Sequence, residues 1–263
     1  MPQIILADNH EQVYPVWQER KLQNITLTHL DFHCDMRGIM IDRKKGSAFF
    51  ISERETTFID RGNFLAHAIM GGIVSDLRWI HGPRGGRAYD VGPVVSYETD
   101  YLAPLHRYNH NRSGRKEVEF KFEESLLSDW QGIRKGEILD IDWDAFASVE
   151  YDAAHRDELV AEFFNREFPI VPALTTLIFS PGYSDPDRSL YSAFAERLAE
   201  TFKAEIIELP KARLNREGES NSVLKKLIKR YAPSQVLDLK RTLSRKWRKL
   251  ESAKDLEHFD NAA

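Results

Sequence analysis

The stretch that decides the fold is residues 25–38, ITLTHLDFHCDMRG. Its β-branched first half predicts a strand, and Asp31, His33 and Asp35 then recur at every second position. Side chains two residues apart share a face of a strand, so these three converge if the strand continues or if its end curls over a site. The residues between them point the other way, and Cys34 is therefore expected in packing rather than as a ligand or nucleophile.

A second stretch, residues 136–148 (GEILDIDWDAFAS), places Asp140, Asp142 and Asp144 directly after an apolar pair. Carboxylates at the end of one buried strand repel one another, so either some are protonated with raised pKa values or a cation neutralises them. Each triplet taken alone could be a polar strand end that hydrogen-bonds loop backbone. Two such ends in one chain favour the cation, with Asp144 the member most suited to supporting the others or capping a helix.

A third strand end carries His10, in the sequence ADNHEQ at residues 7–12. In α/β folds, binding sites form at the carboxyl end of a strand, where the chain continues into a helix. A set of His and Asp ligands without thiolate suits Mn²⁺, Fe²⁺ or Co²⁺, and Zn²⁺ also remains possible. The ligands outnumber those that one Zn²⁺ needs, so we expect two metal ions bridged by carboxylates, which would lower the pKa of a shared water.

Composition narrows the class of protein. The chain has 263 residues, 42% of them hydrophobic, and a formal charge of −4 from 37 basic and 41 acidic side chains. This near-balance gives no reason to expect nucleic acid or an anionic membrane as partner. A single cysteine excludes an internal disulfide and fits a reducing cytosol, and we expect no signal peptide and no membrane span, hence a cytoplasmic protein. The sequence predicts no oligomeric state.

Short apolar runs alternate with helical patterns as far as residue 210. Runs such as QIILAD, NITLTHLD, EVEFKFEE, EILDID, ALTTLIFSP and AEIIEL predict strands, and the segments between several of them predict helices, one of them at residues 62–77. This order predicts an α/β fold, with a mostly parallel sheet between helices. Residues 211–263 are charged and predict C-terminal helices that pack on the 1–210 domain, or whose basic face binds an acidic partner.

The metal motifs resemble those of the arginase–deacetylase (ureohydrolase) superfamily: an early His, an Asp-x-His-x-Asp strand and a downstream Asp-x-Asp strand. The resemblance covers roughly residues 1 to 200 and implies a three-layer α/β/α sandwich. It also implies two Mn²⁺ ions. One ion would be held by His10, Asp31, Asp35 and Asp140. The other would be held by Asp31, His33, Asp140 and Asp142. Asp142 is thereby also a candidate catalytic residue.

The chain departs from ordinary arginases in ways that bear on its substrate. The Asp-x-Asp run lacks a following Asp-Pro, and the late strand lacks the acid that grips free arginine. The chain looks most like the atypical branch that includes peptide arginases, which convert arginine side chains of peptides to ornithine. Asn63 and His67 resemble a run that contacts substrate and relays protons, with a wider spacing. The acids that could hold the guanidinium are Glu98, Asp100 and Asp185.

Two other functions fit the same residues. Amide hydrolysis, as in the deacetylase branch, would use Tyr183 of the Pro-Gly-Tyr run to polarise the carbonyl oxygen; an ordinary turn tyrosine is the alternative for this residue. A non-catalytic module would use the metal to stabilise its fold, and would lose the fold with the metal.

Overall fold

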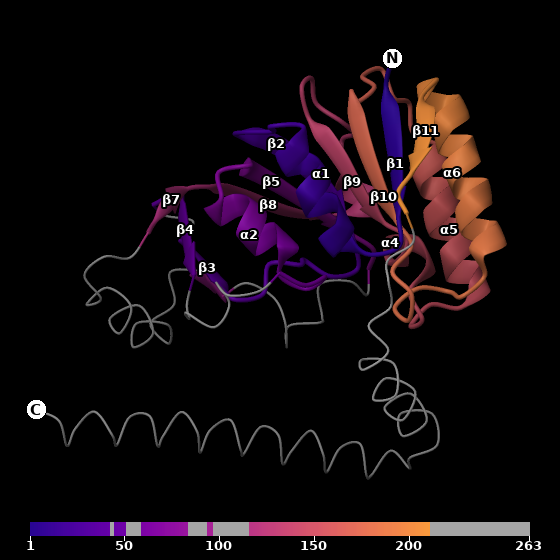
Figure 1. Ribbon diagram of the computed structural model, residues 1–263. Helices are drawn as coiled ribbons and strands as arrows, with labels where there is room; N and C mark the ends of the chain where they lie inside the picture. Colours follow the sequence, from indigo (N-terminus) through magenta and orange to yellow (C-terminus); the bar gives the residue numbers. More distant parts are fainter. Residues whose placement is uncertain (43–44, 51–58, 84–93, 97–115, 211–263) are drawn as a thin grey trace, which may run out of the picture. The chain divides into compact units, whose positions relative to one another are not determined.

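The computed structural model describes residues 1–42, 45–50, 59–83, 94–96 and 116–210 (Figure 1). Its main sheet has seven strands in the order β11-β1-β10-β9-β2-β5-β8, and every pairing in it is parallel. The strands are β1 (Gln3–Ala7), β2 (Ile25–Leu30), β5 (Val74–His81), β8 (Lys121–Leu126), β9 (Ile138–Asp142), β10 (Leu174–Ile178) and β11 (Glu205–Glu208). The expected parallel α/β sheet is confirmed.

Helices cover both faces of this sheet. One face carries η1 (His10–Gln12), α1 (Val13–Glu19) and α2 (Phe64–Met70), and the other carries α4 (Asp144–Ala147), α5 (Ala153–Phe164) and α6 (Arg188–Phe202), as Figure 1 shows. A short 3₁₀ helix, η4 (Leu127–Asp129), follows β8. The architecture is therefore a three-layer α/β/α sandwich.

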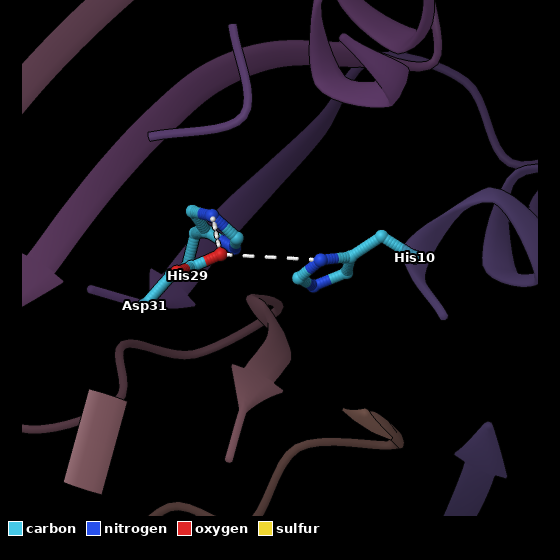
Figure 2. A group of neighbouring side chains, drawn as sticks. All are labelled: His10, His29 and Asp31. Atoms are coloured by element: carbon cyan, nitrogen blue, oxygen red, sulfur yellow. Dashed lines mark ion pairs between the residues drawn. The ribbon is translucent and has the colours of Figure 1, made fainter. Parts of the chain in front are cut away.

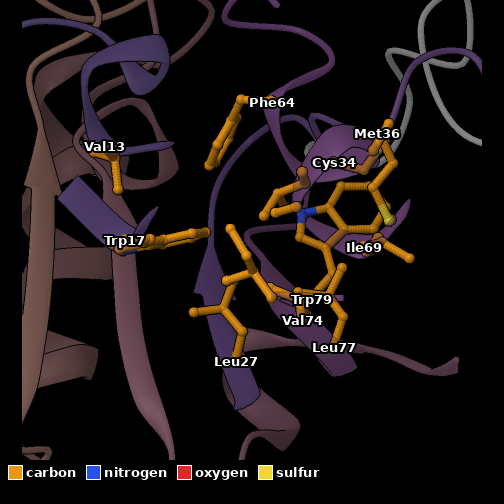
Figure 3. Packing of buried hydrophobic residues seen from close by; sticks show 14 of the residues in the cluster. Val13, Trp17, Leu27, Cys34, Met36, Phe64, Ile69, Val74, Leu77 and Trp79 are labelled. Carbon is orange, nitrogen blue, oxygen red and sulfur yellow. The ribbon is translucent and has the colours of Figure 1, made fainter. Parts of the chain in front are cut away.

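Two apolar clusters hold the layers together, because adjacent strand residues face opposite ways. In β1, Ile5 packs into the cluster that contains Trp17 of α1 and Phe64 of α2, part of which is drawn in Figure 3. Its neighbour Ile4 packs into the cluster that contains Phe163 of α5 on the other face. Each face of the sheet thus has its own core, and both cores are built from apolar side chains.

The sequence patterns did not predict a second, smaller sheet, whose strands lie between residues 39 and 119. It has the order β6-β3-β4-β7, with β3 (Ile39–Asp42), β4 (Ser47–Phe50), β6 (Val94–Ser96) and β7 (Val118–Glu119). The EVEFKFEE run, expected as one strand, contributes to both sheets, because it divides at Phe120 into β7 and β8. The helix expected over residues 62–77 is also shorter, since it ends at Met70 before two glycines and β5 begins at Val74.

The predicted C-terminal helices at residues 211–263 lie outside the described residues, so the domain boundary at residue 210 stays a prediction. Within the described part of the chain, no helix combines the length and the hydropathy needed to cross a membrane.

Candidate metal centre

The site residues gather where β1, β2 and β9 end. Because these strands are parallel members of one sheet, their carboxyl ends meet at the same edge. His10 follows β1, Asp31 follows β2, Asp140 lies in the middle of the short strand β9, and Asp142 is the last residue of β9. The sequence order of the three motifs is therefore converted by the fold into one buried cluster of imidazoles and carboxylates.

The segment after β2 curls over this edge. The strand ends at Leu30, and Asp35 adopts a left-handed backbone conformation with φ of 49°. The His33 N–H donates to Asp31 Oδ1 at 2.6 Å, which closes the curl. Of the two arrangements that the sequence allowed, a curled strand end is the one found. Cys34 is buried in the apolar cluster, where it was expected.

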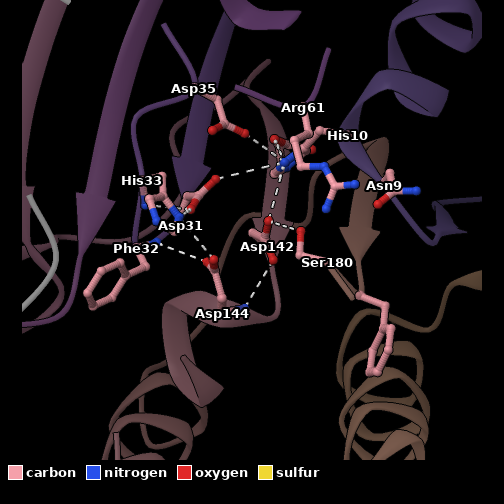
Figure 4. A network of polar contacts seen from close by, with 12 residues as sticks. Asn9, His10, Asp31, Phe32, His33, Asp35, Arg61, Asp142, Asp144 and Ser180 are labelled. Carbon is pink, nitrogen blue, oxygen red and sulfur yellow. Dashed lines mark hydrogen bonds and ion pairs between the residues drawn. The ribbon is translucent and has the colours of Figure 1, made fainter. Parts of the chain in front are cut away.

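His10 lies at the centre of the cluster, where it contacts carboxylates from two chain segments (Figure 4). Its Nδ1 is 2.8 Å from Asp35 Oδ2 and 3.3 Å from Asp142 Oδ2, and its Nε2 is 3.5 Å from Asp140 Oδ2. The Phe64 ring stacks on the His10 imidazole, with 4.5 Å between the ring centres, and this contact fixes the plane of the imidazole. His10 is thus brought together with the acids expected to share its metal.

His29 belongs to the cluster although it was not among the expected ligands. It is fully buried on β2, with Nδ1 2.8 Å from Asp140 Oδ2 and Nε2 3.1 Å from Asp31 Oδ2. Figure 2 shows it with Asp31 and His10. The signal was present in the sequence, since His29 continues the every-second-residue pattern of Asp31 and His33 by one step toward the amino terminus.

His33 and Asp144 form the more exposed side of the cluster. His33 Nδ1 is 3.0 Å from Asp144 Oδ2, and Asp144 Oδ1 accepts the N–H of Phe32 at 3.3 Å. The His33 side chain is 26% exposed, whereas that of Asp144 is buried. Asp144 supports the curled segment, as expected, but it also contacts His33 directly and is positioned to bind a cation.

Hydroxyl groups from β10 and from the segment that follows it hold the two acids of β9. Thr176 on β10 donates to Asp140 Oδ1, and Ser180 donates to Asp142 Oδ2. Ser180 itself has a left-handed backbone with φ of 49°, a conformation that costs energy for a residue with a side chain. Sparsely populated backbone at two positions of one site, Asp35 and Ser180, is typical of functional sites.

The electrostatics of the cluster is dominated by burial and by like charge. Burial, together with repulsion from Asp144 and Asp35, raises the pKa of Asp31 to about 6. Burial alone would lower the pKa of His29, but its close contacts with the carboxylates of Asp140 and Asp31 outweigh that effect and raise the pKa to about 10. Protons on the imidazoles therefore balance the carboxylates, and a bound cation would take over that role.

Two groups of side chains in the described residues are placed to hold a metal ion. Within each group the ligand atoms lie within 4.8 Å of one another. The groups are His10, His29 and Asp31, and Asp31, His33 and Asp144. In the first group, none of His10 Nε2, His29 Nε2 and Asp31 Oδ2, all buried, makes a well-aligned hydrogen bond, and His29 Nε2 and Asp31 Oδ2 face each other as an ion pair at 3.1 Å. When a cation replaces the imidazole protons, these buried atoms have lone pairs to donate to it, and Asp31 is common to both groups.

The residues expected to contact substrate are more dispersed. Tyr183 is 44% exposed and its ring stands edge-on to that of His33 at 5.4 Å, so it lies beside the cluster. The Asp185 carboxylate pairs with Arg156 at 3.1 Å. Asn63 is buried at the start of α2, and the His67 ring lies 5.2 Å from that of Phe50. Glu98 and Asp100 lie outside the described residues.

Comparisons with known proteins add little at the level of sequence. No protein-family profile matches the chain, and no curated protein matches it. Among solved structures, proclavaminate amidino hydrolase from Streptomyces clavuligerus aligns with a TM-score of 0.36 and 14% identity. The alignment covers 77% of this chain and 64% of that one, so this chain spans less than two thirds of that protein. A likeness this distant does not define a family or an activity.

Proposed function

We propose that this chain is a metal-dependent hydrolase that converts arginine side chains in a peptide to ornithine and releases urea. The observation that carries the proposal is the buried cluster at the carboxyl ends of β1, β2 and β9, in which Asp31 is shared by two possible ligand groups. The resemblance of the Asp-x-His-x-Asp and Asp-x-Asp motifs to ureohydrolases supports a guanidino substrate.

The proposed ligands are those of the sequence motifs, with Mn²⁺ as the preferred ion and Fe²⁺, Co²⁺ or Zn²⁺ as alternatives. They are His10, Asp31, Asp35, Asp140, His33 and Asp142. The structure adds His29 and Asp144 as further donors within reach. Bound divalent ions would supply Lewis-acid activation of water. Thr176 and Ser180 orient the carboxylates of β9, so the ligand positions do not depend on the ions alone.

The overall reaction adds water to the guanidinium carbon and breaks the bond between that carbon and the side-chain nitrogen. The nitrogen takes a proton and leaves as the ornithine ammonium group, while the carbon leaves in urea. His67 is the proposed proton donor, and Asn63 the proposed substrate contact. Glu98 and Asp100 are the preferred acids for the guanidinium, because Asp185 would have to give up Arg156.

The test is incubation of Mn²⁺-loaded protein with arginine peptides and, in parallel, with free arginine. We expect mass spectrometry to show loss of one CH₂N₂ unit per arginine in the peptide, with matching urea, and no reaction of free arginine. Asp140→Asn should abolish the reaction, whereas Asp129→Asn, which changes an exposed acid outside the cluster, should retain it. Absence of both mass loss and urea from a metal-loaded protein would refute the proposed reaction.

Amide hydrolysis is the second candidate, and the position of Tyr183 favours it. The hydroxyl-bearing ring lies beside His33, on the exposed side of the cluster, where it could polarise a substrate carbonyl. In this case acetylated lysine peptides or acetylated polyamines would release acetate, and Tyr183→Phe would lower kcat by about a hundredfold. Acetate release without urea would assign the chain to this reaction instead.

A further inference from the structure

Arg61 is a cation beside the candidate metal centre, and the proposed reaction gives it no role. Its Nη1 lies 3.4 Å from the carbonyl oxygen of Pro181, and its guanidinium lies 5.4 Å from the ring centre of Tyr183. Figure 4 shows the side chain with the polar network that contains His10 and Asp142. Since Tyr183 in turn contacts His33, Arg61 belongs to the exposed side of the cluster.

The turn that carries Arg61 is held from several directions. The neighbouring Asp60 pairs through Oδ2 with Arg37 at 2.6 Å and accepts the Gly62 N–H through Oδ1 at 2.9 Å. The Asp60 N–H donates to Asn63 Oδ1 at 2.8 Å. Asp60, the acid next to Arg61 in sequence, therefore already pairs with Arg37. The hydrogen bonds of the Asp60 and Gly62 backbone fix the chain on both sides of Arg61.

Within the described part of the chain, Arg61 consequently has no carboxylate partner. A guanidinium group has several N–H donors in a planar fork that matches a carboxylate, and the long contact with Pro181 uses only one of them. The acids of the cluster do not serve as that partner, because their contacts are with His10, His29 and His33. The remaining donors are available to a bound molecule.

We propose that Arg61 binds a carboxylate of the substrate close to the reacting side chain, an inference that rests on the proposed function. Arg61 would repel the cationic side chain of an arginine substrate, and a carboxylate on the same peptide offsets that repulsion. Loading the cluster with divalent ions neutralises most of its acids, so a carboxylate can then approach. Two sources carry this chemistry: the C-terminal carboxylate of the peptide and an acidic side chain next to the arginine.

The test measures binding without turnover. Lysine peptides keep the positive charge but have no guanidino carbon to hydrolyse. Two pairs are compared on Mn²⁺-loaded protein by calorimetry: a C-terminal lysine as free acid or amide, and an internal lysine followed by Glu or Gln. We expect the acid member of one pair to bind about ten- to hundredfold more tightly, as for a charge-assisted hydrogen bond. The pair that shows the difference identifies the source of the carboxylate.

Arg61→Gln should remove this preference, and Arg61→Lys should keep part of it. The matched control Arg134→Gln changes an exposed arginine that pairs with Glu123, and it should keep the preference in full. Equal affinity for acid and neutral peptides in the wild-type protein, or a preference that survives in Arg61→Gln, overturns the proposal.

A parallel urea assay on the corresponding arginine peptides separates this proposal from the proposed function. A carboxylate preference without urea refutes the reaction and supports the Arg61 subsite. Urea without a preference supports the reaction and refutes the subsite.

Discussion

At the scale of single residues, His29 and Asp31 show what a sequence pattern can and cannot reveal. The alternation of Asp31, His33 and Asp35 was enough to predict that they serve one site, although β2 ends at Leu30 and a curled segment, rather than the period of two, brings them to the cluster. The same period includes His29, yet a histidine inside a β-branched strand is indistinguishable from a core histidine until its neighbours are known. Its contact with Asp140 comes from strand pairing between β2 and β9, which local sequence does not encode.

The raised pKa of His29 leads to a pH prediction for the metal-free protein. Its folded-state pKa of about 10 exceeds the ordinary value of 6.5, so the protonated ring stabilises the fold. That contribution is complete below about pH 6.5 and is lost as the pH rises through about 10. We expect urea denaturation of metal-free protein to give a lower free energy of unfolding at pH 10 than at pH 7.

His29→Asn should show a smaller decrease over the same pH range. His155→Asn is the control, because His155 is partly exposed, lies outside the cluster and pairs with the exposed Asp152, and this variant should behave like the wild-type protein. A wild-type free energy that rises with pH, or an unchanged slope in His29→Asn, would argue against the assigned ion pairs.

At the scale of elements, the apolar runs predicted the inner strands of the main sheet, such as β9 and β10, because these parallel strands are buried on both faces. The second sheet was not predicted because its strands are short and two of its three pairings, β3 with β6 and β4 with β7, join distant parts of the chain. The length of α2 was overestimated because the helical pattern continues past Gly71 and Gly72, where β5 takes over. Patterning predicted the type of most elements better than the residue at which each element ends.

A buried ion pair joins three strands of the main sheet. Arg78 on β5 contacts Glu137, which precedes β9, through Nη1 at 2.9 Å, and Thr28 on β2 donates to Glu137 at 2.9 Å. Both charged side chains are almost fully buried. Arg78→Met leaves the Glu137 carboxylate buried without its cation, and we expect it to lower the free energy of unfolding by about 3 kcal/mol.

The double variant Arg78→Met/Glu137→Gln removes the orphan charge but keeps an acceptor for Thr28. It should recover more than about 1 kcal/mol of that loss, measured by urea denaturation. A double variant that is less stable than Arg78→Met would mean that the pair is not electrostatically coupled.

At the scale of the whole molecule, we expect the fold to be independent of the candidate metal centre. The two apolar clusters pack the sheet against its helices on either face, and the polar site occupies only one edge. A metal at this edge therefore adds to a fold that already has its core. The alternation of strands and helices predicted the parallel α/β sheet, and the resemblance of the three motifs implied the three-layer sandwich, whereas several residues proposed to contact substrate follow strand ends, where the sequence does not specify the course of the chain.

Removal of metal with a chelator should thus leave the far-UV circular dichroism and cooperative unfolding intact. Adding Mn²⁺ at about a hundred times its Kd should raise Tm by roughly 5–10 °C through preferential binding to the folded state. Unfolding of the metal-free protein would instead favour the non-catalytic module, in which the metal supports the fold.

The most direct measurement is native mass spectrometry of the protein after loading with Mn²⁺ and removal of free ions. We expect two bound ions in the wild-type protein and in Asp129→Asn, and none in Asp31→Asn, because Asp31 belongs to both ligand groups. A wild-type protein that retains no ion, or an Asp31→Asn variant that still retains two, would contradict a metal centre at the ends of β1, β2 and β9.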